Sequence, residues 1–143
     1  MVSIRRARLS EMPEVRRLYD AAGYRATVSE RAVVFAAHHA GELVGVARLE
    51  PEEATLVLRG MQVRTDHQGQ GIGMALLTAV AEHLGNAPCY CVPYTHLRAF
   101  YGRVGFVELS TAACPLFLNL RATEYRSRGL DVIVMGRISA DSV

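Results

Sequence analysis

The spacing of apolar residues predicts that the chain begins with a strand and a helix. Val2–Arg6 has the composition of a short strand, and the apolar positions between Ser10 and Gly23 repeat at helical spacing. Ser10 is a residue type that caps the start of a helix, and Gly23 is a type that ends one. We therefore expect a first helix from about Ser10 to Gly23.

The next part of the chain has the pattern of a β-hairpin followed by a third strand. Two apolar runs, Ala32–Ala37 and Leu43–Leu49, flank the polar turn Ala40-Gly41-Glu42. A second turn is expected at Pro51-Glu52-Glu53, and a further strand is expected from Thr55 to Val63. The two apolar runs therefore predict a β-hairpin, and Thr55–Val63 is the fourth strand of the chain.

The strand Thr55–Val63 leads through a glycine-rich turn into a second helix. Gly60 interrupts the strand, which indicates a bulge or a close approach of another part of the chain. The apolar positions from Ile72 to Leu84 lie on one helix face, and Gly85-Asn86 ends that helix.

The last third of the chain predicts three strands and two helical segments. The expected regular elements are a strand Pro88–Val92, a helix near Thr95–Arg103, a strand Phe106–Leu109 and a final strand Asp131–Arg137. The segment between the last two strands is far longer than a plain hairpin loop, so we expect an inserted helical segment near 111–129.

The inserted segment has the pattern of an amphipathic helix. Leu116, Phe117 and Leu120 are expected on one side, with Arg121 and Glu124 on the other. Three roles stay open: covering a pocket, covering a sheet edge, or joining a second subunit in a homodimer.

The length and net charge of the chain limit the number of domains and the kinds of partner that we expect. The 143 residues amount to one ordinary domain, 1–143. The net charge is only +2, and the densest basic group is Arg5, Arg6 and Arg8. A nucleic-acid partner is therefore not expected.

The cysteines and the apolar runs bear on metal binding and location. Cys89, Cys91 and Cys114 lack metal-ligand spacing, and two of them share one face of a strand, so we expect core thiols and no metal. The chain shows no export leader and no apolar run of about 18 residues, so no membrane association is expected. A reducing cytoplasm is the default location.

The turn after Val63 carries the strongest chemical signal. Gly69, Gly71 and Gly73 precede or open a helix whose first amides lack intrahelical partners and lie at the positive end of the helix dipole. A pyrophosphate fits such a turn. The turn lacks the Gly-Lys-Ser/Thr of nucleotide hydrolases, because Gly73 is followed by Met74, and it lacks the Gly-x-Gly-x-x-Gly spacing of dinucleotide sites.

The turn instead resembles the acyl-CoA loop of the GNAT family of N-acetyltransferases. Gln68-Gly69-Gln70-Gly71-Ile72-Gly73 is similar to the family's Gln/Arg-x-x-Gly-x-Gly/Ala signature, and Phe100–Phe106 is similar to its Phe-Tyr-x-x-x-Gly-Phe block. The resemblance implies the GNAT acyl-CoA N-acyltransferase fold. In this α/β (α+β) fold, a mixed, mostly antiparallel seven-stranded sheet is flanked by helices.

The resemblance also implies an activity and a cofactor site. The expected reaction moves an acetyl group directly from acetyl-CoA, the co-substrate, to a primary amine of a small molecule or a peptide. The Val63 amide is the expected oxyanion donor. The cofactor-binding set is Met61, Val63, Gln68, Gly69, Gln70, Gly71, Ile72, Gly73, Met74 and Tyr101.

Tyr101 stands where many family members place the acid that protonates the departing thiolate. A phenol suits this role because its ordinary pKa near 10 keeps it protonated at neutral pH. Tyr94 departs from the pattern, since many relatives have asparagine there.

The base is harder to assign from the sequence. Val57 occupies the position where the histone-type branch has a glutamate. Glu50, at the end of the preceding strand, is the catalytic base that we predict, through water; His38, His39 and His96 are the other candidates.

Two rival functions stay open. One is a non-catalytic acyl-CoA-sensing or interaction module, which the missing glutamate favours. The other is a nucleic-acid binder, which would require the N-terminal arginines to form one face and would predict a steep loss of affinity with salt.

Overall fold

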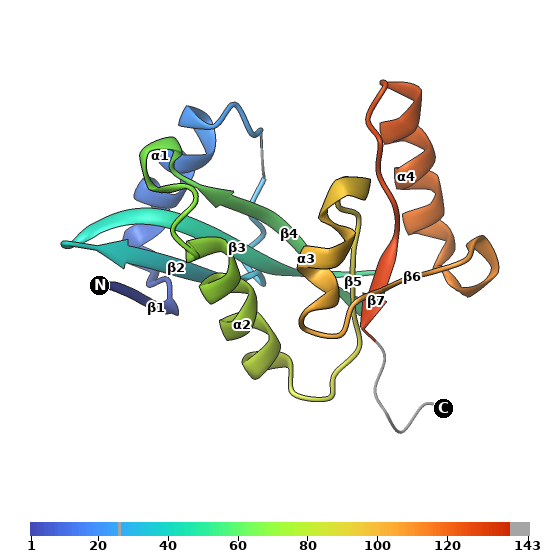
Figure 1. Cartoon of the computed structure of the whole chain (residues 1–143), viewed down its shortest axis with the longest axis horizontal. Coiled ribbons are helices and arrows are strands. Elements are labelled where there is room, and N and C mark those ends of the chain that lie inside the picture. Colours follow the sequence, from blue (N-terminus) through green and yellow to red (C-terminus); the bar gives the residue numbers. More distant parts are fainter. Residues whose placement is uncertain (26, 138–143) are drawn as a thin grey trace. The chain divides into compact units, whose positions relative to one another are not determined.

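The computed structural model describes residues 1–25 and 27–137 (Figure 1). Residues 138–143, the end of the predicted domain 1–143, lie outside the described residues. The strands are β1 Val2–Arg6, β2 Val33–His39, β3 Glu42–Glu52, β4 Thr55–Val63, β5 Cys89–Cys91, β6 Val107–Glu108 and β7 Met135–Arg137. The helices are α1 Met12–Ala21, α2 Ile72–Leu84, α3 Arg98–Gly102 and α4 Leu116–Ser127.

Within the described ranges, the strands form one seven-stranded sheet in the order β1-β2-β3-β4-β5-β7-β6. The pairs β1–β2, β2–β3, β5–β7 and β6–β7 are antiparallel, whereas β4 and β5 pair in parallel at Val57 and Tyr90. This is the mixed, mostly antiparallel sheet that the sequence predicted.

The chain falls into two compact units. The first comprises Met1–Pro51 and Leu58–His83, and the second comprises Glu52–Val57 and the chain from Leu84 onward. Because the division passes through β4, this strand contributes residues to both units.

In the first unit, helices cover both faces of β2 and β3 (Figure 1). Val15 and Leu18 of α1 pack with Val34 and Ala36 of β2. α2 lies on the opposite face, so close that a Cβ on Gly45 would be 3.1 Å from Leu76. Since side chains alternate along a strand, a strand buried on both faces must be apolar throughout, as the run from Val34 to Ala37 is.

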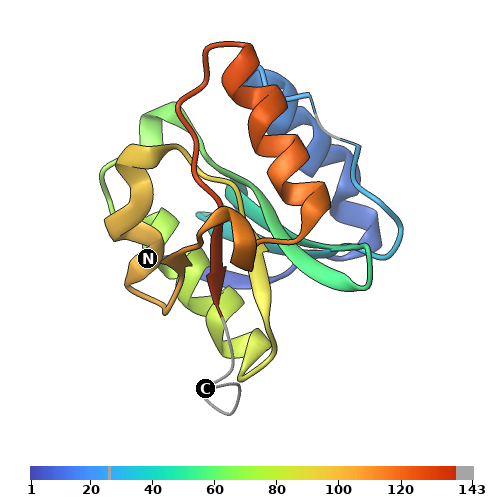
Figure 2. The same ribbon diagram turned by 90° about the vertical axis from the view of Figure 1, so that its right-hand side faces the viewer.

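In the second unit, α3 and α4 lie on opposite sides of β7 (Figure 2). Leu118 and Ala122 of α4 are fully buried and pack with Val57, Val132 and Val134. The ion pair between Arg121 of α4 and Glu52 adds a polar contact to this apolar packing.

The burial of α4 differs from the predicted amphipathic pattern. Leu116 and Leu120 were expected on the apolar side, but they are 72% and 61% exposed, whereas Leu118 and Ala122 are buried. Apolar residues occur around the whole helix, so their spacing alone did not identify the buried face. The contacts identify α4 as a cover for the Val57 face of the second unit.

Two other local predictions were wrong at element boundaries. Ser10 lies within a short 3₁₀ helix, Leu9–Glu11, and Glu11 caps this turn by accepting a hydrogen bond of 2.8 Å from the Arg8 amide. β3 continues through Pro51 to Glu52, and the turn falls at Glu53 and Ala54, whose φ angles are 47° and 63°.

Candidate functional site

The glycine turn, Gln68–Gly71, lies in the first unit between β4 and α2. Gly69 and Gly71 have φ angles of +78° and +80°, which side-chain-bearing residues rarely adopt. No protein atom lies within 4 Å of the position that a Cβ would take on either residue. Glycine is therefore required here by backbone conformation, and the turn leaves its backbone accessible.

The start of α2 presents backbone amides next to this turn. The hydrogen bond from the Ala75 amide to the Gly71 carbonyl measures 3.0 Å, as expected for the first turn of a helix. The amides of Ile72, Gly73 and Met74 precede it and belong to the group that lacks intrahelical acceptors. They lie at the positive end of the helix dipole, an arrangement that suits an anion.

The Gln68 side chain links the start of the glycine turn to the end of β4. Its Nε2 donates a hydrogen bond of 3.0 Å to the Val63 carbonyl at the end of β4. The sequence predicted Gln68 as a cofactor contact, which stays a prediction; the observed bond shows that its side chain ties the loop to β4.

Charged side chains beside the turn neutralise one another. Arg64 donates hydrogen bonds of 3.1 Å to Glu42 and 2.8 Å to Asp66, and these bonds raise the pKa of Arg64. His67 Nδ1 lies 2.9 Å from Asp66 Oδ1, and hydrogen bonds from His67 and Arg64 lower the pKa of Asp66. With Arg64 bound to two carboxylates, the backbone amides are the available donors for an anion.

A pocket of about 400 Å³ lies beside β4 in the first unit. One wall is formed by Leu18, Ala21 and Ala22 near the end of α1, and the other by Gln62–Asp66 with Gln68. The pocket therefore brings together Val63 and Gln68 of the predicted cofactor set.

The predicted irregularity of β4 at Gly60 is confirmed. Gly60 has a φ of +65°, and a Cβ there would lie 2.3 Å from Arg48 Nη1 and 2.4 Å from the Tyr19 hydroxyl. The Tyr19 hydroxyl donates a hydrogen bond of 2.9 Å to the Gly60 carbonyl. Glycine thus permits both a strained backbone and a close approach.

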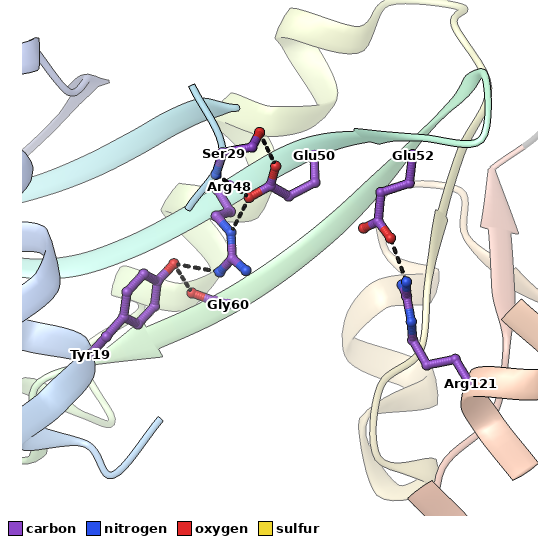
Figure 3. Close-up of polar contacts among 7 residues, drawn as sticks. All are labelled: Tyr19, Ser29, Arg48, Glu50, Glu52, Gly60 and Arg121. Atoms are coloured by element: carbon purple, nitrogen blue, oxygen red, sulfur yellow. Dashed lines mark hydrogen bonds and ion pairs between the residues drawn. The ribbon is translucent and has the colours of Figure 1, made fainter. Parts of the chain in front are cut away.

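Glu50 lies in a buried ion pair (Figure 3). It accepts hydrogen bonds of 2.7 Å from Arg48 Nε and 2.6 Å from the Ser29 hydroxyl. Burial alone would raise the pKa of Glu50, but the bonds from Ser29 and Arg48 outweigh it and lower the pKa. A carboxylate held in this way favours a structural role over proton abstraction, and its assignment as the base stays a prediction.

The other predicted bases also have neighbours. His38 Nε2 lies 2.9 Å from Glu11 Oε2, and the His39 ring lies 5.3 Å from the ring of His67. His96, in the second unit, stacks on Tyr94 with ring centroids 5.8 Å apart. Val57, where the resemblance led us to look for a glutamate, is 1% exposed within an apolar cluster.

Tyr101 belongs to the second unit, in α3. It is 7% exposed, and its ring makes edge contacts with Phe100 and Phe106, with centroids 5.0 and 6.1 Å away. The Tyr101 carbonyl accepts hydrogen bonds from Val104 and Phe106. The Phe-Tyr-x-x-x-Gly-Phe block thus folds into a compact turn that fixes the tyrosine.

Sequence reasoning missed the polar contacts of Tyr19, Ser29 and Arg48. Tyr19 was read only as an apolar helix position, and Arg48 only as part of a strand. One signal was present: Arg48 is a charged residue inside the otherwise apolar run Leu43–Leu49. A charge in such a run needs a buried partner.

The residues that the structure describes bear on two expected absences, those of a metal site and of a membrane span. Among these residues, no group of three or more His, Cys, Asp or Glu side chains is placed to hold a metal ion. None of their helices combines the length and the apolar character needed to cross a bilayer.

Comparisons with known proteins identify the family. A family model described as an acetyltransferase (GNAT) domain matches residues 30–108, more than half of the chain. The chain therefore belongs to the GNAT family of N-acetyltransferases, which confirms the family, fold and enzyme class predicted from the sequence. No curated protein matches the chain significantly.

Solved structures show the same fold. Escherichia coli ElaA has a TM-score of 0.72 and 17% identity, covering 96% of this chain and 99% of that one. The ribosomal-protein-S18-alanine N-acetyltransferase from Escherichia coli has a TM-score of 0.71 and 19% identity, covering 98% and 96%. Arabidopsis thaliana Naa50, in complex with a bisubstrate analogue of CoA, has a TM-score of 0.65 and 17% identity, covering 94% and 97%.

Proposed function

We propose that the protein transfers an acetyl group from acetyl-CoA to a primary amine. The observation that carries the proposal is the accessible backbone of the glycine turn at the start of α2, where Gly69 and Gly71 hold positive φ angles. Membership of the GNAT family supports it. The pyrophosphate would be held by backbone amides from Gln68 to Met74, since neighbouring Arg64 is bound to carboxylates.

The end of β4 would hold the rest of the cofactor. We assign backbone contacts to Met61 and Val63, and the Val63 amide would polarise the thioester carbonyl. The pocket beside Val63 and Gln68 supports this placement, because it opens next to the glycine turn.

Bound acetyl-CoA supplies the acetyl group, and the acceptor amine attacks its thioester carbonyl carbon. As the C–N bond forms and the C–S bond breaks, the nitrogen loses one proton and the departing sulfur gains one. We assign to Tyr101 the donation of the proton that the sulfur gains. The Tyr101 ring is fixed by Phe100 and Phe106. Glu50 remains the predicted base, acting through water, although its lowered pKa makes it a weak one.

The proposed acceptor is defined by its chemical class, a primary amine on a small molecule or a peptide. A cytoplasmic location is part of the proposal, because Cys89, Cys91 and Cys114 are free, buried thiols of the kind that a reducing compartment preserves.

The glycine turn provides the test. Gly71→Val should weaken acetyl-CoA binding by more than about tenfold, because a β-branched side chain would enter the space in front of the amides and disfavour the required φ. The matched control is Gly129→Val: Gly129 has a φ of +86° and likewise no atom within 4 Å of its Cβ position. Calorimetric titration of both variants decides. Equal affinity in Gly71→Val and the control would place the pyrophosphate elsewhere.

A non-catalytic acyl-CoA module is the alternative, favoured by the burial of Val57 in an apolar cluster. It would bind acetyl-CoA without acetylating any amine. Turnover of a panel of small amines and peptide N-termini separates the two functions.

A further inference from the structure

A chain of buried polar contacts joins four separate segments of the first unit, namely α1, the segment around Ser29, β3 and β4 (Figure 3). The Tyr19 hydroxyl donates to the Gly60 carbonyl, and Arg48 Nη1 donates to the Tyr19 hydroxyl at 3.3 Å. Arg48 Nε donates to Glu50, which also accepts bonds from the hydroxyl and amide of Ser29. We call these five residues the buried network; it connects β4 to α1 and to the segment that follows α1.

Burial makes each charge in the network depend on its partner. Arg48 and Glu50 are 1% and 4% exposed. The guanidinium also lies over the Tyr19 ring, 5.5 Å from its centroid. An arginine can serve both partners because its planar group directs several N–H donors in fixed directions, which lysine cannot do.

The left-handed conformation of Gly60 and the network depend on each other. A Cβ on Gly60 would lie 2.9 Å or less from Tyr19 and Arg48 atoms, so their positions depend on a glycine in this conformation. Conversely, the hydrogen bond from Tyr19 holds the Gly60 carbonyl in place. The strand residues after Gly60 therefore take their direction from this contact.

Both walls of the pocket are attached to the network. Gln62 and Val63 follow Gly60 on β4, and Ala21 and Ala22 follow Tyr19 at the end of α1. The Tyr19 carbonyl also accepts a hydrogen bond of 3.2 Å from the Ala22 amide. A single buried cluster thus fixes the two surfaces that face each other across the pocket.

We propose that Arg48 and Tyr19 are positioning residues that set the separation of these two walls and the direction of the Val63 amide. This inference rests on the proposed function, in which Val63 polarises the thioester. Neither residue contacts reacting atoms in this role. Their effect is on how well the β4 backbone is aligned for transfer, and small misplacements reduce rates strongly.

The first test is Tyr19→Phe, which keeps the ring but removes the bond to Gly60. The matched control is Tyr24→Phe, because the Tyr24 ring also lies near Arg48, 5.8 Å away, but leaves the Gly60 contact intact. Hydrogen exchange in the ligand-free protein should become at least tenfold faster in Tyr19→Phe for amides of Met61–Val63, with no such change in the control. The kcat for amine acetylation should fall about tenfold, while the Kd of acetyl-CoA changes less than threefold.

A second variant tests the network without leaving an unpaired buried charge, which could unfold the protein. Arg48→Met with Glu50→Gln removes both buried charges together, so that no unpaired charge is left. A folded double variant with the same faster exchange supports the positioning role; its kcat is not used, because Glu50 is also the proposed base. Wild-type exchange and kcat in Tyr19→Phe, or wild-type exchange in a folded double variant, would overturn it.

The exchange measurement needs no ligand, so it separates this inference from the proposed function. If the wild-type protein neither binds acetyl-CoA nor acetylates an amine, the proposed function fails, and the exchange rates alone decide whether the network positions β4.

Discussion

At the level of single residues, the hydrogen-bond and charged partners of a buried group determine its pKa and therefore its charge. Burial alone would lower the pKa of Arg48, but Tyr19 and Glu50 outweigh it, and the pKa is raised. Burial also raises the pKa of Tyr19 to about 12, so its hydroxyl stays protonated and can donate to Gly60 at any ordinary pH. The Tyr19 hydroxyl and the Arg48 guanidinium therefore hold a fixed protonation state at neutral pH, which suits a positioning role better than proton transfer.

The catalytic role of Tyr101 is testable by removing one oxygen. Tyr101→Phe keeps the edge contacts with Phe100 and Phe106 and loses the proton proposed for the thiolate. We expect kcat to fall about 10²-fold with little change in the Kd of acetyl-CoA. Steady-state kinetics and calorimetry give the two numbers. An equal loss in both would make Tyr101 a cofactor contact, and no loss in either would remove it from the site.

The ion pair of Arg5 with Glu11 gives a prediction for acid stability. Hydrogen bonds from Arg5 and the Arg8 amide lower the pKa of Glu11 to about 2. The unfolded state therefore binds the proton more tightly, so the contribution is complete above the ordinary carboxyl pKa and is lost as pH falls towards 2.

Urea unfolding of Glu11→Gln and the wild type, from pH 6 down to pH 2.5, measures this contribution. The difference in unfolding free energy should shrink as pH falls. Glu14→Gln, in α1, gives the background. A difference that is the same at every pH would show that the ion pair does not stabilise the fold.

At the level of elements, the local sequence pattern predicted the bounds of those helices and strands that local interactions determine. β1, β4 and α2 have the predicted bounds, and those of α2 follow from apolar positions that repeat at helical spacing until Gly85 ends the helix. The buried side of α4 was missed, because tertiary contacts with Val57 and Val134 select Leu118 over Leu120. The run of β3 through Pro51 was missed because proline is rare inside strands, so Pro51 was expected in a turn.

The packing of α4 predicts unequal costs for two identical substitutions. Leu118→Ala should reduce the unfolding free energy by about 2–5 kcal/mol, because the side chain is fully buried and its removal leaves a cavity. Leu120→Ala, in the same helix but 61% exposed, should change it by about 0.5 kcal/mol or less. Chemical denaturation of both variants checks this. Equal costs would mean that Leu120 is covered in solution.

At the level of the whole molecule, the family and the fold were predictable, whereas the buried network was not. The glycine turn and the Phe-Tyr block are contiguous motifs, so the sequence alone displays them. The network joins residues that are 29 and 41 positions apart, and only the folded chain brings them together. The prediction of a single domain, 1–143, stays a prediction, as do the acceptor and the base.

The most direct test of the central claim is amine-dependent release of CoA from acetyl-CoA, with mass spectrometry of the acceptor. We expect wild-type protein to acetylate at least one primary amine in a panel of small amines and peptides. Gly71→Val should lose most of its kcat/KM, whereas Gly129→Val should retain it. If acetyl-CoA binds at the glycine turn but no amine in the panel is acetylated, the protein is an acyl-CoA-binding module and the claim of catalysis is wrong.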